Sequence, residues 1–193
     1  GMHTVTLTVT DVNGNVSTCD GELTVEDNVA PIAICQDITI GLDANGEAFI
    51  TAGDIDNGSN DACGTPSLSI AGDDEDWDCT EIGTHTVTLT VTDVNGNIST
   101  CEGELTVEDT IAPILVCNDV LVNLDPGLCG DIVQYAIETE DNCGVAIEVL
   151  VSGPASGTYL DYHDSPWSVT WDVTDVNGNL STCSFSITLN EYS

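Results

Sequence analysis

Carboxylates dominate the residues of this chain that could do chemistry, and their spacing suits a hard metal ion. The segment Asp54-Ile-Asp56-Asn-Gly-Ser-Asn-Asp61 places oxygen-bearing side chains at alternate positions around a glycine turn. It is similar to the first half of a calcium-binding loop, although the glutamate that closes such a loop is absent. The pattern predicts a Ca²⁺ site. The competing interpretation is a solvated acidic surface on which Asp and Asn only form turns.

Similar residues recur where two domains are expected to meet. If the first strand of a domain runs away from the preceding domain, the loop after its second strand and its closing hairpin turn both return to that junction. Acids of the linker arrive at the same place, and several oxygens meeting there would suit Ca²⁺. The predicted ligands are Asp27, Asp54, Asp56, Asp61, Asp93 and Asn95 at the first junction, and Asp109, Asp141, Asp175 and Asn177 at the second.

Nine cysteines form the second reactive set. Two pairs take equivalent positions, each first Cys four residues after a proline and each second Cys four residues after an Asn-Gly-Asn turn. In a sandwich whose first and last strands run side by side, such positions fall at the same height. Elimination then leaves two further pairs, of which the last requires a bent segment. The predicted disulfides are Cys35–Cys101, Cys117–Cys183, Cys63–Cys79 and Cys129–Cys143.

Cys19 has no partner in this scheme, which places its partner upstream of the chain or in a neighbouring subunit. Zinc binding is the weaker interpretation of the cysteines, because the chain has no paired CxxC motif. A disulfide framework indicates an extracellular or otherwise oxidising location.

A long internal repeat sets the domain organisation. His3–Asp37 and His85–Asp119 lie 82 residues apart and are identical at 28 of 35 positions, and Trp167–Leu189 is a weaker third copy. Such a period is typical of an array of similar domains. We expect the last two strands of a repeat over 1–27, a complete repeat over 28–109 and a divergent complete repeat over 110–193. The first residues align with the repeat itself, so we interpret the chain as a window on a longer polypeptide or as a processed subunit.

Strand patterns predict an all-β fold. Val and Leu alternate with Thr from His85 to Asp93, and an Asn-Gly turn leads into a returning strand from Ser99 to Glu108. Further strands are expected near 32–40, 48–52 and 67–71, with loops over 54–64 and 72–83 and no helix. Short strands with regular turns favour tandem immunoglobulin-like β-sandwich repeats, with a core thin enough to need disulfides.

The charge balance excludes several classes of partner. The chain has 34 acidic residues and no Lys or Arg, which gives a formal charge of −34. Nucleic acid and anionic membrane surfaces are excluded, because both require cationic side chains. No apolar run is long enough for membrane insertion. Salt, low pH or divalent cations must offset the self-repulsion. No His lies in a nucleophile or metal motif, so we expect no enzyme.

The repeat resembles the hyalin-repeat (HYR) family. The matching features are Ala-Pro-Ile-x-x-Cys-x-Asp, Asn-Gly-Ser-Asn-Asp-Ala-Cys-Gly, Gly-Thr-His-Thr-Val-Thr-Leu-Thr-Val-Thr-Asp-Val-Asn-Gly-Asn and Ser-Thr-Cys. They cover essentially the whole chain, although the third copy lacks a counterpart of Cys79 and adds Cys129. The resemblance implies an immunoglobulin-like fold in long, extracellular, adhesive bacterial surface proteins, without catalysis.

The expected function is therefore structural. We predict a segment or subunit of a cell-surface fibre or adhesin, rigidified by disulfides and Ca²⁺, whose partners are copies of itself or continuing repeats. One alternative is a module that binds a carbohydrate or protein ligand on its loops or Thr faces. Another is a non-catalytic spacer of a larger secreted enzyme.

Overall fold

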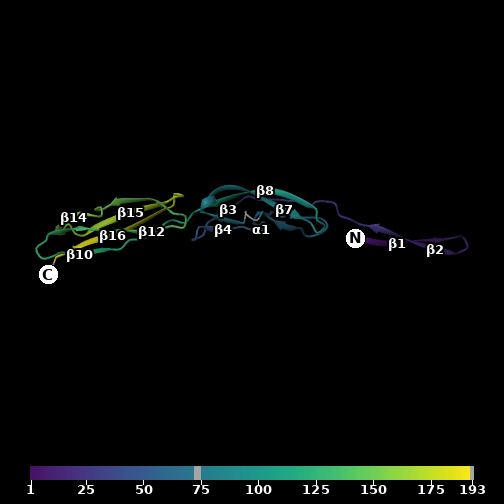
Figure 1. Cartoon of the computed structure of the whole chain (residues 1–193), viewed down its shortest axis with the longest axis horizontal. Coiled ribbons are helices and arrows are strands. Elements are labelled where there is room, and N and C mark those ends of the chain that lie inside the picture. Colours follow the sequence, from purple (N-terminus) through teal and green to yellow (C-terminus); the bar gives the residue numbers. More distant parts are fainter. Residues whose placement is uncertain (72–74, 192–193) are drawn as a thin grey trace. The chain divides into compact units, whose positions relative to one another are not determined.

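The computed structural model describes residues 1–71 and 75–191, and in these ranges the chain is mostly β-strand (Figure 1). Its residues group into two compact units. The first contains Gly1–Gln36, Thr51–Ala71 and Val87–Gly103, and the second contains Asp37–Ile50, Gly72–Thr86 and Glu104–Ser193. The units do not follow the 82-residue period, so the domain boundaries expected after residues 27 and 109 stay predictions.

The first unit begins with a two-stranded hairpin. Strands β1 (Met2–Thr10) and β2 (Val16–Thr24) pair antiparallel, from Met2 opposite Thr24 to Thr10 opposite Val16. Every residue of both strands is exposed. The alternation of Val or Leu with Thr therefore forms a hairpin, but the structure shows nothing covering its apolar face.

The rest of the first unit holds a short helix, α1 (Ala52–Ile55), and strand β5 (Ser67–Ser69), which pairs antiparallel with β7 (Gly83–Thr92). The segment expected as a strand over 32–40 is a strand only at its end. Before that it makes two isolated bridges, Ile32 with Asn60 and Cys35 with Asp56.

Two further pairs of strands from residues 37–108 form within the second unit. Strand β3 (Ile38–Gly41) runs parallel to β8 (Ile98–Glu108), as expected for first and last strands side by side. Strand β4 (Glu47–Phe49) pairs antiparallel with β6 (Asp76–Asp78).

The last part of the chain forms two layers around a core. One layer is a four-stranded sheet in the order β10-β16-β15-β13, in which β15 and β16 lie side by side (Figure 1). Short antiparallel pairs, β11 with β14 and β12 with β9, accompany it. The bounds are β9 (Ile114–Val116), β10 (Val120–Asn123), β11 (Gly130–Val133), β12 (Glu138–Glu140), β13 (Val145–Ser152), β14 (Thr158–Asp161), β15 (Trp167–Asp175) and β16 (Leu180–Asn190).

Side chains from both layers fill this core. Val169 and Ile187 of the four-stranded sheet are fully buried, and Val133 and Leu160 of the β11/β14 pair pack in the same cluster. In β15 and β16 the alternation of apolar and polar residues thus places one face of each strand inward.

Two elements differ from the expectations. Helix α1 begins at the last residue of the strand expected over 48–52 and extends into the loop expected over 54–64, so the expectation of no helix is wrong. The helix forms because Thr51 and Asp54 make a reciprocal capping box and Ile55 is fully buried. The loop expected over 72–83 contains strand β6 and the 3₁₀ turn Cys79–Glu81, since Trp77 is buried between two exposed aspartates. Residues 72–74 of that loop lie outside the described residues.

Candidate metal centre

Three carboxylates converge in the second unit. Asp109 follows β8, Asp141 follows β12 and Asp175 ends β15, and one oxygen of each lies within 4.8 Å of the others. Asp109 and Asp175 are 7% and 2% exposed, and Asp141 is half-buried. Carboxylates this close together and largely shielded from water repel one another, and a cation between them would offset the repulsion.

The turn after β15 fixes Asp175. Its Oδ1 accepts the backbone N–H groups of Asn177, Gly178 and Asn179 at 2.8, 2.6 and 2.8 Å, and its Oδ2 accepts the Asn179 amide at 2.7 Å. Burial raises the pKa of this carboxyl, but the hydrogen bonds outweigh it, and the pKa lies below its usual value. Asp175 is therefore held ionised and rigid.

Asp109 and Asp141 are only half satisfied. Asp109 Oδ1 accepts N–H groups of Ile111 and Asn142, both at 3.1 Å. Asp141 Oδ1 accepts the backbone N–H groups of Cys143 and Gly144 at 3.0 and 2.9 Å. The other oxygen of each carboxylate, and the Asn142 amide oxygen, are buried and accept no hydrogen bond.

Buried acceptors without donors are uncommon in folded proteins, and each calls for a partner such as an ion or water. A chain without Lys or Arg supplies no side-chain cation beyond histidine. Calcium takes carboxylate and amide oxygens in flexible geometry and completes its shell with water. The residues around Asp109 therefore fit a Ca²⁺ ion.

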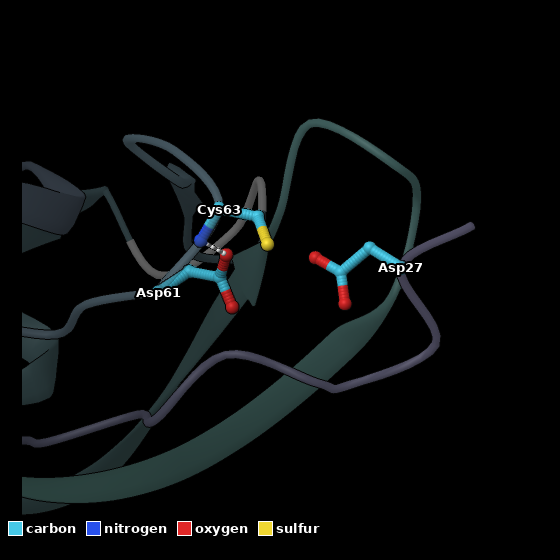
Figure 2. A group of neighbouring side chains, drawn as sticks. All are labelled: Asp27, Asp61 and Cys63. Atoms are coloured by element: carbon cyan, nitrogen blue, oxygen red, sulfur yellow. Dashed lines mark hydrogen bonds between the residues drawn. The ribbon is translucent and has the colours of Figure 1, made fainter. Parts of the chain in front are cut away.

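A related cluster lies in the first unit, formed by Asp27, Asp61 and Cys63 (Figure 2). Both carboxylates and the thiol face a common space, and the Cys63 backbone N–H donates to Asp61 at 2.7 Å. Asp61-Ala-Cys63-Gly matches Asp141-Asn-Cys143-Gly, and Asp27 is the repeat counterpart of Asp109. The two clusters thus use equivalent positions.

Hydrogen bonds shift the pKa values of the groups in and beside this first cluster. The Val29 N–H and the Cys63 thiol lower the pKa of Asp27, together with the Asn95 amide at 3.1 Å. The Asp27 carboxylate in turn raises the pKa of the Cys63 thiol. Burial opposes ionisation of Asp93, but donors from the Asn95–Asn97 turn outweigh it and lower its pKa.

The structure gathers some predicted ligands and separates others. Asp54 and Asp56 belong to neither cluster, because each carboxylate is used locally: Asp54 caps α1 through Thr51, and Asp56 accepts Ser59 and Gly58 N–H groups. Asp93 lies beside the first cluster, where the Asn97 amide donates to both Asp93 and the Asp27 carbonyl. Asn177 is exposed and contributes its backbone N–H.

Sequence reasoning missed Asn142 and Cys63 as members of the two clusters. Each lies next to or near a predicted acid in an Asp-x-Cys-Gly loop, and the recurrence of that loop was the signal that could have identified them.

All nine cysteines lie within the described ranges. The bonds Cys35–Cys101 and Cys117–Cys183 are present. The pairs Cys63–Cys79 and Cys129–Cys143 are not formed; Cys79 bonds Cys143 instead, and Cys19, Cys63 and Cys129 are free and exposed. The elimination failed because it paired cysteines within each repeat, whereas Cys79 and Cys143 belong to successive copies of the period.

No protein-family model matches the chain, and no curated protein matches it. Among solved structures the chain is similar to human protocadherin-24 EC1-2 form II, with 15% identity and a TM-score of 0.39 over 86% of this chain and 100% of that one. It is also similar to protocadherin gammaB7 EC3-6, with 15% identity and a TM-score of 0.33 over 98% of this chain and 58% of that one.

A third similar structure is the protocadherin GammaB4 extracellular domain, with 18% identity and a TM-score of 0.34 over 98% of this chain and 37% of that one. The chain thus spans less than two thirds of the last two structures. TM-scores below 0.5 do not establish a shared fold, so the likeness says nothing about what this chain does.

Among the described residues, no helix has the length and apolar character needed to cross a bilayer.

Proposed function

We propose that this chain is a structural, extracellular repeat protein of the hyalin-repeat type, a segment or subunit of a surface fibre or adhesin. The proposal gives it immunoglobulin-like sandwiches over 28–109 and 110–193, half of one over 1–27, and no catalysis. Disulfides and Ca²⁺ stiffen it. The observation that carries the proposal is the cluster of Asp109, Asp141 and Asp175, in which one buried oxygen of Asp109 and one of Asp141 lack donors.

The position of this cluster explains why an ion would stiffen the chain. Asp109 is the last residue of one proposed repeat, and Asp141 and Asp175 belong to the next. An ion held by all three ties the repeats at their linker. Cys79–Cys143 joins the same two repeats covalently. Disulfides of this kind are typical of secreted and surface proteins, which supports the extracellular location.

The exposed hairpin supports self-association with repeat-like partners. Leu7 and Val9 of β1 are 60% and 57% exposed, whereas their counterparts Leu89 and Val91 in β7 are fully buried. The same contrast separates Leu23 of β2 from its fully buried counterpart in β8. A face that is core in one copy of the repeat therefore has the composition to pack against strands of the same chemistry, from a continuing repeat or from a second copy.

Thermal melting with Ca²⁺ and with a chelator tests the metal. We expect a higher midpoint with Ca²⁺, because a ligand bound only by the folded state raises its stability, by about 2.7 kcal/mol at 100 times its Kd. Asp54→Asn is the matched control: it removes one carboxylate that caps α1 and should keep the Ca²⁺ shift. Equal midpoints with Ca²⁺ and chelator would remove the ion from the proposal.

Negative-stain images test the fibre, and a compact monomer at high concentration with Ca²⁺ would contradict it.

A ligand-binding module is the second candidate. In the second unit, the exposed Phe49 and the acids Glu47, Asp76 and Asp78 line an open depression of about 580 Å³. An aromatic ring beside carboxylates is suited to sugar hydroxyls and ring faces. Binding of defined glycans on an array, lost in Phe49→Ala, would favour this candidate.

A further inference from the structure

The loop over 141–144 connects the three acids of the candidate metal centre. It carries Asp141, and its Asn142 amide donates to Asp109 Oδ1 at 3.1 Å. The last carbonyl of the loop accepts the backbone N–H of Val176 at 3.1 Å, from the turn that follows the third acid. A displacement of this loop would therefore disturb the arrangement of all three carboxylates at once.

A disulfide fixes this loop to a part of the second unit that carries none of the three acids. Cys143 of the loop bonds Cys79, which begins the 3₁₀ turn after β6. Asp78 caps that turn by accepting the Thr80 N–H at 2.7 Å, and β6 is itself paired with β4. The Cys79 sulfur also lies 3.4 Å from the Asn142 carbonyl oxygen. The loop is thus held covalently against a capped and paired element.

This attachment matters most while no ion is bound. Asp109 and Asp141 each have one buried oxygen without a donor, and their carboxylates lie close to that of Asp175. Repulsion among the three favours loop positions in which Asp141 moves away from the others, and the bond to Cys79 limits such movement. A site that is already assembled loses less conformational freedom when its ligand binds, and therefore binds more tightly.

We propose that the Cys79–Cys143 disulfide, here called the anchoring bond, is a positioning element of the metal site, so that closing it strengthens Ca²⁺ binding. The inference rests on the Ca²⁺ site of the proposed function. Such coupling is reciprocal: if the bond tightens ion binding by some factor, the ion makes the bond harder to reduce by the same factor. The site therefore gains affinity in the oxidising surroundings in which disulfides persist, which is where the chain is proposed to stiffen.

Reduction by glutathione makes the coupling measurable. Two glutathione thiols give two electrons and two protons to the anchoring bond, through a mixed disulfide, and leave two protein thiols and one glutathione disulfide. The three free cysteines are blocked first. The chain is then equilibrated at graded glutathione ratios, with Ca²⁺ or with chelator, and new thiols are alkylated. Peptide mapping gives the reduced fraction of each bond, with a protease that cleaves after acidic residues because the chain has no Lys or Arg.

We expect saturating Ca²⁺ to lower the reduction equilibrium constant of the anchoring bond about tenfold, within the usual range of coupling between two sites. A tenfold change corresponds to about 30 mV in reduction potential. Cys35–Cys101 is the control in the same sample, because it lies in the first unit, and it should not shift. Asp141→Asn, which removes a charged ligand from the loop, should lose most of the shift.

Calorimetric titration with Ca²⁺ measures the other side of the linkage. Cys79→Ser/Cys143→Ser should raise the Kd by the same factor by which Ca²⁺ shifts the anchoring bond. Cys35→Ser/Cys101→Ser is the matched control, which also removes one disulfide and should keep the Kd of the parent chain. All the titrated chains carry Asp27→Asn, which removes one carboxylate from the first cluster, so that the heat reports the second.

The outcomes separate this inference from the proposed function. If the wild type binds Ca²⁺ but the anchoring bond does not shift, or shifts no more than Cys35–Cys101, the coupling is overturned and the metal site stands. A full shift in Asp141→Asn would also overturn it. If the wild type binds no Ca²⁺, the metal site fails and the coupling fails with it. The redox titration uses the unsubstituted chain, so it decides the matter even if the serine variants do not fold.

Discussion

The residue Asp175 and its copies Asp93 and Asp11 each organise a hairpin turn around their own carboxylate. In all three, Oδ1 accepts two backbone N–H groups at 2.8 Å, from the residues two and four positions later, and Oδ2 accepts the amide of the later Asn at 2.7 Å. Asp11 does so in a hairpin that is exposed throughout. This geometry is therefore local, whereas the proximity of Asp175 to Asp109 depends on the tertiary fold.

At this scale we predict that Asp109→Asn has opposite effects with and without metal. In chelator it should raise the melting midpoint, because one of three crowded negative charges is removed while Oδ1 can still accept from Asn142 and Ile111. With Ca²⁺ it should lose most of the wild-type shift, because a charged ligand is gone. Calorimetry of the wild type and of Asp109→Asn, each in chelator and in Ca²⁺, measures both changes in the melting midpoint. A variant that keeps the full Ca²⁺ shift would show that the ion binds elsewhere.

At the scale of the element, two hairpins of nearly the same sequence differ in how far their apolar side chains are buried. Strands β7 and β8 bury their Val and Leu side chains completely, and β1 and β2, with nearly the same sequence, expose theirs by half or more. Pairing within the hairpin requires only its own turn and alternation. Burial requires a second layer, and of these two hairpins the described residues supply one to β7 and β8 but not to β1 and β2.

Matched substitutions measure this difference. Leu89→Ala should cost about 2–5 kcal/mol of unfolding free energy, the usual range for a buried leucine replaced by alanine. Leu7→Ala removes the same atoms from a side chain that is 60% exposed, and should change stability by less than about 0.5 kcal/mol. Urea unfolding of the dilute chain compares them. A loss at Leu7 as large as that at Leu89 would mean that other strands cover the hairpin in solution.

At the scale of the whole molecule, uncompensated charge is the dominant electrostatic feature. The formal charge is −34, and the ion pair that the described residues form, His163 with Asp161 at 2.9 Å, is exposed. Exposed pairs contribute little to stability. Folding therefore brings carboxylates closer together without internal compensation, and the solvent must screen them.

Salt should accordingly stabilise the metal-free protein. Raising NaCl from about 0.01 M to about 1 M shortens the Debye length from roughly 30 Å to roughly 3 Å. We expect the melting midpoint in chelator to rise over this range, and to rise less with Ca²⁺ bound. A sugar at matched osmolality is the control for solvent exclusion. A midpoint that stays level or falls with salt would contradict a repulsion-limited fold.

The fold was predictable where it depends on neighbours along the chain. Alternating Val and Thr predicted the long hairpins, Asn-Gly predicted their turns, and equivalent spacings predicted the bonds Cys35–Cys101 and Cys117–Cys183, all present in the structure. Helix α1 was missed because its stability comes from a capping box and the burial of Ile55 rather than from a helical pattern. Strand β6 was missed because Asp76 and Asp78 on either side of the buried Trp77 make the segment acidic, which favoured its interpretation as a solvated loop.

The sequence by itself determined the period, the β class, the absence of any Lys or Arg and the acids from which a metal site can be built. The tertiary structure alone decided which of those acids meet and which cysteines bond. Asp54 and Asp56 have the spacing of ligands, yet their carboxylates are taken by their own turns, while Asp109 and Asp141 approach each other with oxygens left over. Cys79 and Cys143 are 64 residues apart. Contacts over such separations depend on the path of the whole chain, which spacing along the sequence does not specify.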